Sequence, residues 1–180
     1  MADYDLTRLS VLIIDDNRHM RTLVRSILMA LGIRNITEAD DGSSALKLMK
    51  TIDADIVICD WQMQPMDGIQ FTKLVRKSEN SPDIYVPIIM LTGHTEMTRV
   101  VTARDAGVNE FLAKPILAKN IYQRIKMILD SPRQYIRTDE YFGPDRRRRA
   151  DPAYNGPERR RSAEDVESEK PKTDDETKEA

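Results

Sequence analysis

The sequence predicts an α/β domain in which helices cover both faces of a five-stranded parallel sheet, a doubly wound fold. Short apolar runs rich in β-branched residues alternate with segments of helical period, which is the pattern of such a sheet. The runs are almost continuously apolar, as in Val86-Pro87-Ile88-Ile89-Met90-Leu91. This continuity indicates strands that are buried on both faces, and it argues against a half-exposed antiparallel sheet.

Five strands are expected, and each interval between them has room for a helix. The strands are expected at residues 9–14, 33–37, 56–59, 85–91 and 108–112. After the first strand, an apolar stripe at helical spacing contains Met20, Leu23, Val24, Ile27 and Leu31. After the last strand, a second stripe contains Ile121, Ile125, Ile128 and Leu129. We therefore assign residues 8–130 to one domain of five β/α units.

The overall composition restricts the classes of function. With a formal net charge of -2 and 32% charged residues, the chain gives no global reason to expect nucleic acid or an anionic membrane as a partner. The single cysteine, Cys59, excludes an intramolecular disulfide and a cysteine zinc cluster, and its apolar neighbours favour a buried strand residue over a reactive thiol. No apolar run is long enough to span a bilayer, and the acidic N-terminus is unlike a signal peptide. We expect a cytoplasmic protein.

Polar residues follow the predicted strands where these strands end. Asp15 and Asp16 follow the first strand, Asp60 the third and Thr92 the fourth, and Lys114 comes just after the fifth. The carboxyl ends of parallel strands converge on one crevice, so these side chains are expected to meet there. Three crowded carboxylates call for a hard cation, and oxygen ligands favour Mg²⁺. With a lysine and a hydroxyl to hold an oxyanion, the set predicts phosphoryl transfer to a carboxylate.

In this order, the motifs resemble those of the CheY-like receiver family of response regulators over residues 8–130. The resemblance implies a flavodoxin-like sheet with strand order 2-1-3-4-5. It also implies that Asp60, which opens the segment Asp60-Trp61-Gln62-Met63-Gln64-Pro65-Met66-Asp67-Gly68, is the phosphoacceptor. Asp16, Asp60 and the backbone carbonyl of Gln62 would ligate Mg²⁺, and Asp15 would contribute through a water molecule.

The same resemblance assigns roles to residues on the later strands. Thr92 and Lys114 would contact the phosphoryl oxygens, and the Lys114–Pro115 peptide would be cis. Phe111 would be the switch aromatic that, with Thr92, couples phosphorylation to the surface of helix 4, strand 5 and helix 5. Phe111 as an ordinary core aromatic is the alternative. His94 either contacts the water that attacks the phosphoryl group or is a solvated loop residue.

The function implied is that of a response regulator in two-component signalling. A sensor histidine kinase or a histidine phosphotransfer protein would phosphorylate Asp60, and the phosphorylated form would dock a downstream protein partner. No enzymatic or DNA-binding output domain fits in residues 131–180, so the chain is expected to catalyse only its own phosphorylation and dephosphorylation. Two alternatives remain open. One is a nucleic-acid-binding regulator that acts through its tail, and the other is a scaffold that is never phosphorylated.

Residues 131–180 are expected to form a disordered tail, because large apolar residues are too few to offset the entropy of ordering the backbone. Within it, Tyr141-Phe142-Gly143-Pro144-Asp145-Arg146-Arg147-Arg148 recurs as Tyr154-Asn155-Gly156-Pro157-Glu158-Arg159-Arg160-Arg161. Residues 146–161 hold seven arginines against two acids, whereas residues 162–180 hold three lysines against eight acids. The repeated arginines are predicted to bind a partner, namely Arg146, Arg147, Arg148, Arg159, Arg160 and Arg161.

Overall fold

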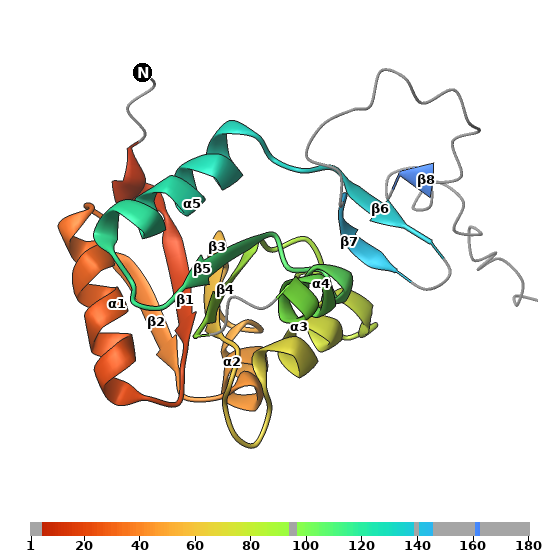
Figure 1. Cartoon of the computed structure of the whole chain (residues 1–180), viewed down its shortest axis with the longest axis horizontal. Helices are drawn as coiled ribbons and strands as arrows, with labels where there is room; N and C mark the ends of the chain where they lie inside the picture. The colour runs from red at the N-terminus through yellow and green to blue at the C-terminus, as the bar shows by residue number, and fades with distance from the viewer. Residues whose placement is uncertain (1–4, 94–96, 139–140, 146–160, 163–180) are drawn as a thin grey trace, which may run out of the picture.

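The structure, a computed structural model, describes residues 5–93, 97–138, 141–145 and 161–162. Five parallel strands form its central sheet in the order β2-β1-β3-β4-β5 (Figure 1). The predicted doubly wound fold and its strand order are confirmed. The strands are β1 (Ser10–Ile14), β2 (Asn35–Ala39), β3 (Ile56–Asp60), β4 (Ile88–Thr92) and β5 (Glu110–Ala113).

Helices alternate with the strands along the chain. They are α1 (Arg18–Ala30), α2 (Gly42–Leu48), α3 (Gly68–Lys77), α4 (Met97–Ala106) and α5 (Ala118–Asp130), preceded by a 3-10 turn at Leu6–Arg8. Three of the helices begin at acid or amide N-caps, whose side chains accept bonds from the first free N–H groups. In the part of the chain that the structure describes, no helix combines the length and the apolar character needed to cross a bilayer.

The sheet separates two apolar layers because successive strand residues point to opposite faces. In β1, Val11 and Ile13 belong to the cluster under α1 and α5, whereas Leu12 and Ile14 belong to the cluster under α2 and α3. Figure 1 shows α1 and α5 on one side of the sheet and α2, α3 and α4 on the other. Every residue of β1, β3 and β4 is buried, as their continuous apolar sequences predicted.

Three strands begin two or three residues later in the chain than predicted. β2 begins two residues after Ile33, whose N–H donates to the carbonyl O of Leu28 and so closes the end of α1. β4 begins after Pro87, which has no N–H to donate to a ladder. β5 begins after Val108, which packs under α4. Before each of these strands, one apolar residue of the predicted strand is buried outside the sheet, namely Ile33, Val86 and Val108.

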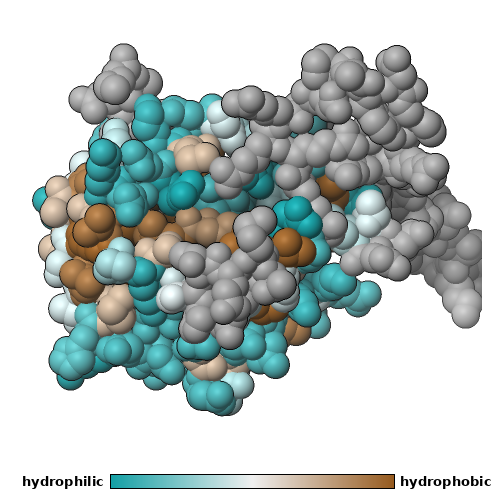
Figure 2. All heavy atoms as spheres, in the orientation of Figure 1, coloured by the Kyte–Doolittle hydropathy of each residue, from teal (hydrophilic) through white to brown (hydrophobic). Residues whose placement is uncertain are grey.

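The predicted stripe on α1 is wrong at one position. Leu23 is 42% exposed, and the side chains buried from this helix are Val24 and Leu28. Met20, Ile27 and Leu31 pack partly buried against the same cluster. Figure 2 shows hydrophobic surface gathered in a band on the side of the molecule formed by α1 and α5, with hydrophilic surface around it.

A hairpin follows α5, so the expectation of disorder from Ser131 onward is wrong for the residues described there. β6 (Tyr135–Arg137) pairs antiparallel with β7 (Phe142–Pro144), and on its other side with β8 (Arg161–Ser162). β7 is part of the first copy of the repeated motif. Its Tyr141 hydroxyl donates to the carbonyl O of Pro144 at 2.7 Å, which closes the side chain over Gly143.

The hairpin covers the amino ends of β4 and β5, where Arg76 of α3 is only 2% exposed. The Arg76 guanidinium donates to the carbonyl oxygens of Gly107, Ile84 and Val86 at 2.7–3.1 Å. It also donates to the side-chain oxygen of Asn109 at 3.1 Å, and the Tyr135 ring covers it with its centroid 5.3 Å away. Burial removes most of the hydration of this guanidinium and lowers its pKa. The four hydrogen bonds and the ring contact compensate this loss of hydration.

Candidate functional site

The polar residues predicted to meet do lie together at the carboxyl ends of the strands. Asp15 directly follows β1, Asp60 is the last residue of β3, Thr92 is the last residue of β4, and Lys114 follows β5. Neighbouring strands hold them in line, because Trp61 donates to the carbonyl O of Leu91 at 3.0 Å and Lys114 to that of Thr92 at 2.8 Å. The parallel register therefore determines which side chains meet.

Three acids form a cluster at this edge. One carboxylate oxygen from each of Asp15, Asp16 and Asp60 lies within 4.8 Å of the other two. Asp15 and Asp60 are buried, and Asp16 is exposed. Oxygen atoms at this spacing suit a small divalent cation, and carboxylates from two strand ends leave room for water ligands, as Mg²⁺ requires.

Asp15 is the most enclosed member of the cluster, and one of its oxygens is not satisfied. Oδ1 accepts a hydrogen bond from the backbone N–H of Asn17 at 2.8 Å. Oδ2 is buried and has no hydrogen-bond donor among the residues that the structure describes. Burial raises the pKa of the Asp15 carboxyl, and the neighbouring charge of Asp60 raises it further, against the lowering effect of the Asn17 N–H. A buried anionic oxygen without a hydrogen-bond donor is costly unless a cation completes its shell.

Lys114 supplies the positive charge on the opposite side of the cluster. Its Nζ lies 2.8 Å from Asp60 Oδ1 and 3.8 Å from Asp15 Oδ2. The peptide between Lys114 and Pro115 is cis, as the family resemblance implied. The Lys114 ammonium and the buried Thr92 thus flank Asp60 from the side of β4 and β5.

The loop after β3 approaches the site closely. Gln62, the expected backbone ligand, is exposed in the bend that follows Asp60. Gly68 begins α3, and its N–H donates to the carbonyl O of Trp61 at 3.0 Å. A Cβ atom at Gly68 would overlap the carbonyl O of Asp60, so only glycine fits there. Gly68 lies within the acceptor segment, but the sequence pattern did not predict this close approach. Its position directly after Asp67, the N-cap of α3, was the available signal.

Phe111 is half-buried on β5 and packs with Trp61 against an apolar cluster under α4. The buried members of this cluster are Ile69, Met90, Ala103, Ala106 and Val108. The cluster joins the residue after Asp60 to the packed face of α4. Both readings of Phe111, switch aromatic and core aromatic, are compatible with this position.

The remaining candidate residues fall into two groups. Cys59 is fully buried in β3, and burial, followed by the charge of Asp60, raises the pKa of its thiol well above the usual value. It is a core residue, as expected. His94 and the first five repeated arginines lie outside the described residues, and Arg161 is described only as part of the backbone of β8.

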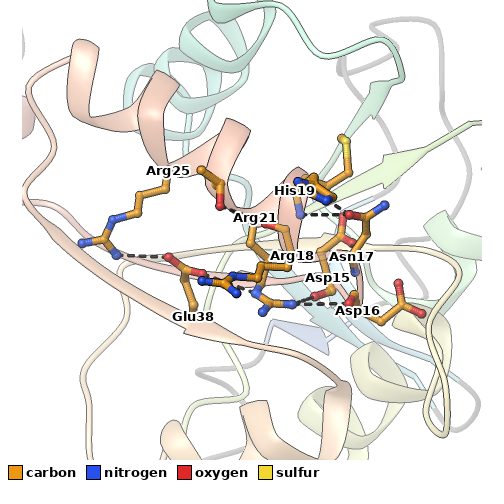
Figure 3. Close-up of polar contacts among 10 residues, drawn as sticks. Asp15, Asp16, Asn17, Arg18, His19, Arg21, Arg25 and Glu38 are labelled. Atoms are coloured by element: carbon orange, nitrogen blue, oxygen red, sulfur yellow. Dashed lines mark hydrogen bonds and ion pairs between the residues drawn. The ribbon is translucent and has the colours of Figure 1, made fainter.

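A further arginine, which the sequence did not single out, reaches the acid pair. Arg21 of α1 donates through Nη1 to the carbonyl O of Asp15 at 2.7 Å, and its Nε lies 3.3 Å from Glu38 Oε2 on β2 (Figure 3). Its bonds to the acid pair go to backbone oxygens, which carry no sequence signal. This contact could therefore be seen only in the structure.

Comparison with known proteins agrees with this geometry. A family model described as the response regulator receiver domain matches residues 11–126. The chain is 35% identical over 122 residues to chemotaxis protein CheY-3 of Vibrio cholerae, an alignment that covers 68% of this chain and 92% of that protein.

Solved structures match a similar share of the chain. The chemotaxis protein CheY4 of Vibrio cholerae superposes with a TM-score of 0.62 at 28% identity, over 67% of this chain and 98% of that one. The receiver domain of a sensor histidine kinase from Pseudomonas aeruginosa, solved with a magnesium ion coordinated in its active-site cleft, has a TM-score of 0.57 at 30% identity. That match covers 66% of this chain and 94% of the other.

Proposed function

Because this chain belongs to the response regulator receiver domain family, we propose that it is a phosphorylation switch of two-component signalling whose phosphoacceptor is Asp60. The observation that carries the proposal is the cluster at the carboxyl edge of the sheet. There, three acid oxygens lie within 4.8 Å of one another and Lys114 Nζ lies 2.8 Å from Asp60. These acids repel one another. A bound cation would relieve this repulsion, and the completed site could then hold a phosphoryl group.

The residues present fit a magnesium ion. The observation in favour is the buried Asp15 Oδ2, which lacks a hydrogen-bond donor among the described residues and belongs to a carboxyl whose pKa burial raises. Asp16, Asp60 and the backbone carbonyl of Gln62 would hold the ion, with Asp15 contributing through water. When bound, Mg²⁺ would neutralise charge on the phosphoryl oxygens.

Asp60 would act as the nucleophile. Its carboxylate oxygen attacks the phosphorus of a phosphohistidine on a sensor kinase or phosphotransfer protein; an acyl–phosphate bond forms, and the P–N bond breaks with its electron pair returning to the imidazole. Lys114 and the Thr92 hydroxyl would then contact the phosphoryl oxygens. Water would later hydrolyse the acyl phosphate, so the chain would catalyse only its own phosphorylation and dephosphorylation.

The output would be a change in the surface formed by α4, β5 and α5, coupled to the phosphoryl group through Thr92 and Phe111. The two helices carry exposed apolar side chains, Val101 on α4 and Met127 on α5, which are 38% and 39% exposed. We further propose that the protein acts in the cytoplasm, where a kinase could reach it, and that the repeated arginines attach it to an acidic partner.

Beryllofluoride, a phosphoryl mimic, tests the proposal. Trp61 adjoins Asp60 and packs in the cluster under α4, so its fluorescence should change when beryllofluoride and Mg²⁺ are both added, and NMR signals of Thr92 and Phe111 should shift. In Lys114→Ala the Mg²⁺ response should persist while the Thr92 and Phe111 shifts shrink. A wild-type chain that does not respond to either addition would support the unphosphorylated scaffold instead.

A further inference from the structure

Arg21 connects the acid pair to the neighbouring strand through three contacts. Its Nη1 donates to the carbonyl O of Asp15 at 2.7 Å and reaches that of Asp16 at 3.4 Å. Its Nε bonds Glu38 Oε2 at 3.3 Å. The side chain is only 16% exposed. Figure 3 shows it passing from Glu38 toward the turn that carries the two acids.

The Asp15–Asp16 turn is otherwise held by a small number of bonds. The N–H of Asp15 donates to the carbonyl O of Ala39 at 3.2 Å, and the Asp15 side chain accepts from the N–H of Asn17. Asp16 is exposed, and beyond it the chain enters α1. Arg21 is therefore the side chain that fixes both carbonyl groups of the pair, and with them the peptide planes from which the two carboxylates project.

Glu38 also pairs with a second arginine, which provides an internal comparison. Arg25, one helical turn after Arg21, places Nη1 3.1 Å from Glu38 Oε1 and is 43% exposed (Figure 3). The two arginines share a helix, a charge and a carboxylate partner. Among their hydrogen bonds described here, only those of Arg21 reach the acid pair.

We propose that Arg21 is a positioning residue for the phosphorylation site, which holds the Asp15–Asp16 turn in the geometry that Mg²⁺ binding requires. The inference rests on the proposed function of the acid cluster. Mg²⁺ demands nearly ideal octahedral coordination, and groups that orient metal ligands typically affect affinity by 10–100-fold. Arg25 pairs with the same glutamate but has no described bond to the backbone of the turn, so it would not have this effect.

The sign of the effect separates positioning from simple electrostatics. A guanidinium close to a cation site repels the cation, so removing its charge would by itself tighten Mg²⁺ binding. If Arg21 acts by positioning, removing it weakens binding in spite of that gain. The direction of the change in Mg²⁺ affinity is therefore diagnostic.

The experiment compares Arg21→Gln with Arg25→Gln in the full chain, at a temperature where circular dichroism shows both to be folded. Mg²⁺ binding is measured by titration calorimetry and by Trp61 fluorescence. We expect the Kd for Mg²⁺ to rise about 10-fold or more in Arg21→Gln and to change less than about twofold in Arg25→Gln. Arg21→Lys, which can still donate one bond to the Asp15 carbonyl, should recover part of the loss.

The rate of phosphorylation by acetyl phosphate provides a second measurement. A merely structural role of Arg21 would not change this rate in the same way. In Arg21→Gln the rate should be low at limiting Mg²⁺ and should approach the wild-type rate at saturating Mg²⁺. Equal or tighter Mg²⁺ binding in Arg21→Gln overturns the inference while leaving the proposed function intact. Failure of the wild-type chain itself to bind Mg²⁺ would overturn the proposed function and this inference together.

Discussion

Two charged side chains are buried at opposite edges of the same sheet, and their surroundings differ. At the amino edge, Arg76 donates to four oxygens and lies under the Tyr135 ring. At the carboxyl edge, Asp15 has one satisfied oxygen, one buried oxygen without a hydrogen-bond donor among the described residues, and two acids beside it. The first arrangement stabilises the fold, whereas the second would be completed by the cation that we propose for this site.

This comparison predicts opposite consequences for substitution at the two edges. Removing a satisfied buried charge leaves several oxygens unpaired and destabilises the fold. Removing an unsatisfied one relieves a penalty and stabilises the fold, at the expense of function.

Arg76→Ala should give the largest loss of stability. The carbonyl groups of Ile84, Val86 and Gly107 would lose their donor in a buried environment, and we expect the free energy of unfolding to fall by about 3 kcal/mol or more. Urea denaturation followed by circular dichroism measures it. Arg104→Ala is the control, because Arg104 forms an exposed ion pair with Asp105 and its loss should cost less than about 0.5 kcal/mol. Equal effects of the two substitutions would contradict the structural role of Arg76.

Truncation after Asp130 should give a smaller loss, since it removes the cover of Arg76 and the Tyr135 and Phe142 contacts with Tyr85. We expect the free energy of unfolding to fall by about 2 kcal/mol. Tyr135→Phe keeps the ring but loses the hydroxyl that donates to the carbonyl O of Tyr85 at 2.6 Å, and should cost about 1 kcal/mol. A truncated chain as stable as the full one would show that the hairpin adds nothing to the domain.

The hairpin also shows what the sequence could not reveal. β1 and β3 were predicted almost to the residue because their apolar runs are continuous and their burial follows from local sequence. The hairpin has few apolar residues, and its burial depends on distant partners, such as Arg76 and Gly107. Gly107, with a φ of +102° after α4, leaves the space against which Gly143 packs, a fit that no local pattern indicates.

The strand-end residues of the acid cluster were easier to predict from the sequence than Arg21, which bonds to the backbone behind them. Asp15, Asp60, Thr92 and Lys114 were found because strand ends are recognisable and parallel strands bring them to one edge. Arg21 was not predicted because its partners are backbone carbonyl oxygens and a glutamate on β2. Residues that act through backbone bonds leave no pattern of residue types in the sequence.

Asp15→Asn should change the free energy of unfolding in the opposite direction to the substitutions at the amino edge. The Asp15 pKa is raised in the folded state, so the ionised carboxylate disfavours folding at neutral pH. The amide can still accept from the N–H of Asn17, and we expect the free energy of unfolding in Mg²⁺-free buffer to rise.

The pH dependence provides the check on this assignment. The folded state holds the Asp15 proton more tightly than the unfolded state, so the penalty is present above the raised pKa and disappears as the pH falls through it toward the ordinary value of 3.8. The advantage of Asp15→Asn over wild type should therefore shrink as the pH is lowered. Added Mg²⁺ should stabilise the wild type more than the variant. An advantage that is independent of pH would show that repacking, and not charge, is responsible.

We propose that Asp60 accepts a phosphoryl group in a Mg²⁺-dependent reaction, which intact-protein mass spectrometry can detect after incubation with acetyl phosphate. The wild-type chain should gain the mass of one phosphoryl group when Mg²⁺ is present and should lose it again on standing. Asp60→Asn, which is nearly isosteric but has no carboxylate nucleophile, should remain unmodified although it is folded, and chelation of Mg²⁺ should prevent the wild-type reaction. Equal labelling of wild type and Asp60→Asn, or no labelling of the wild type at any Mg²⁺ concentration, would show that Asp60 is not a Mg²⁺-dependent phosphoacceptor.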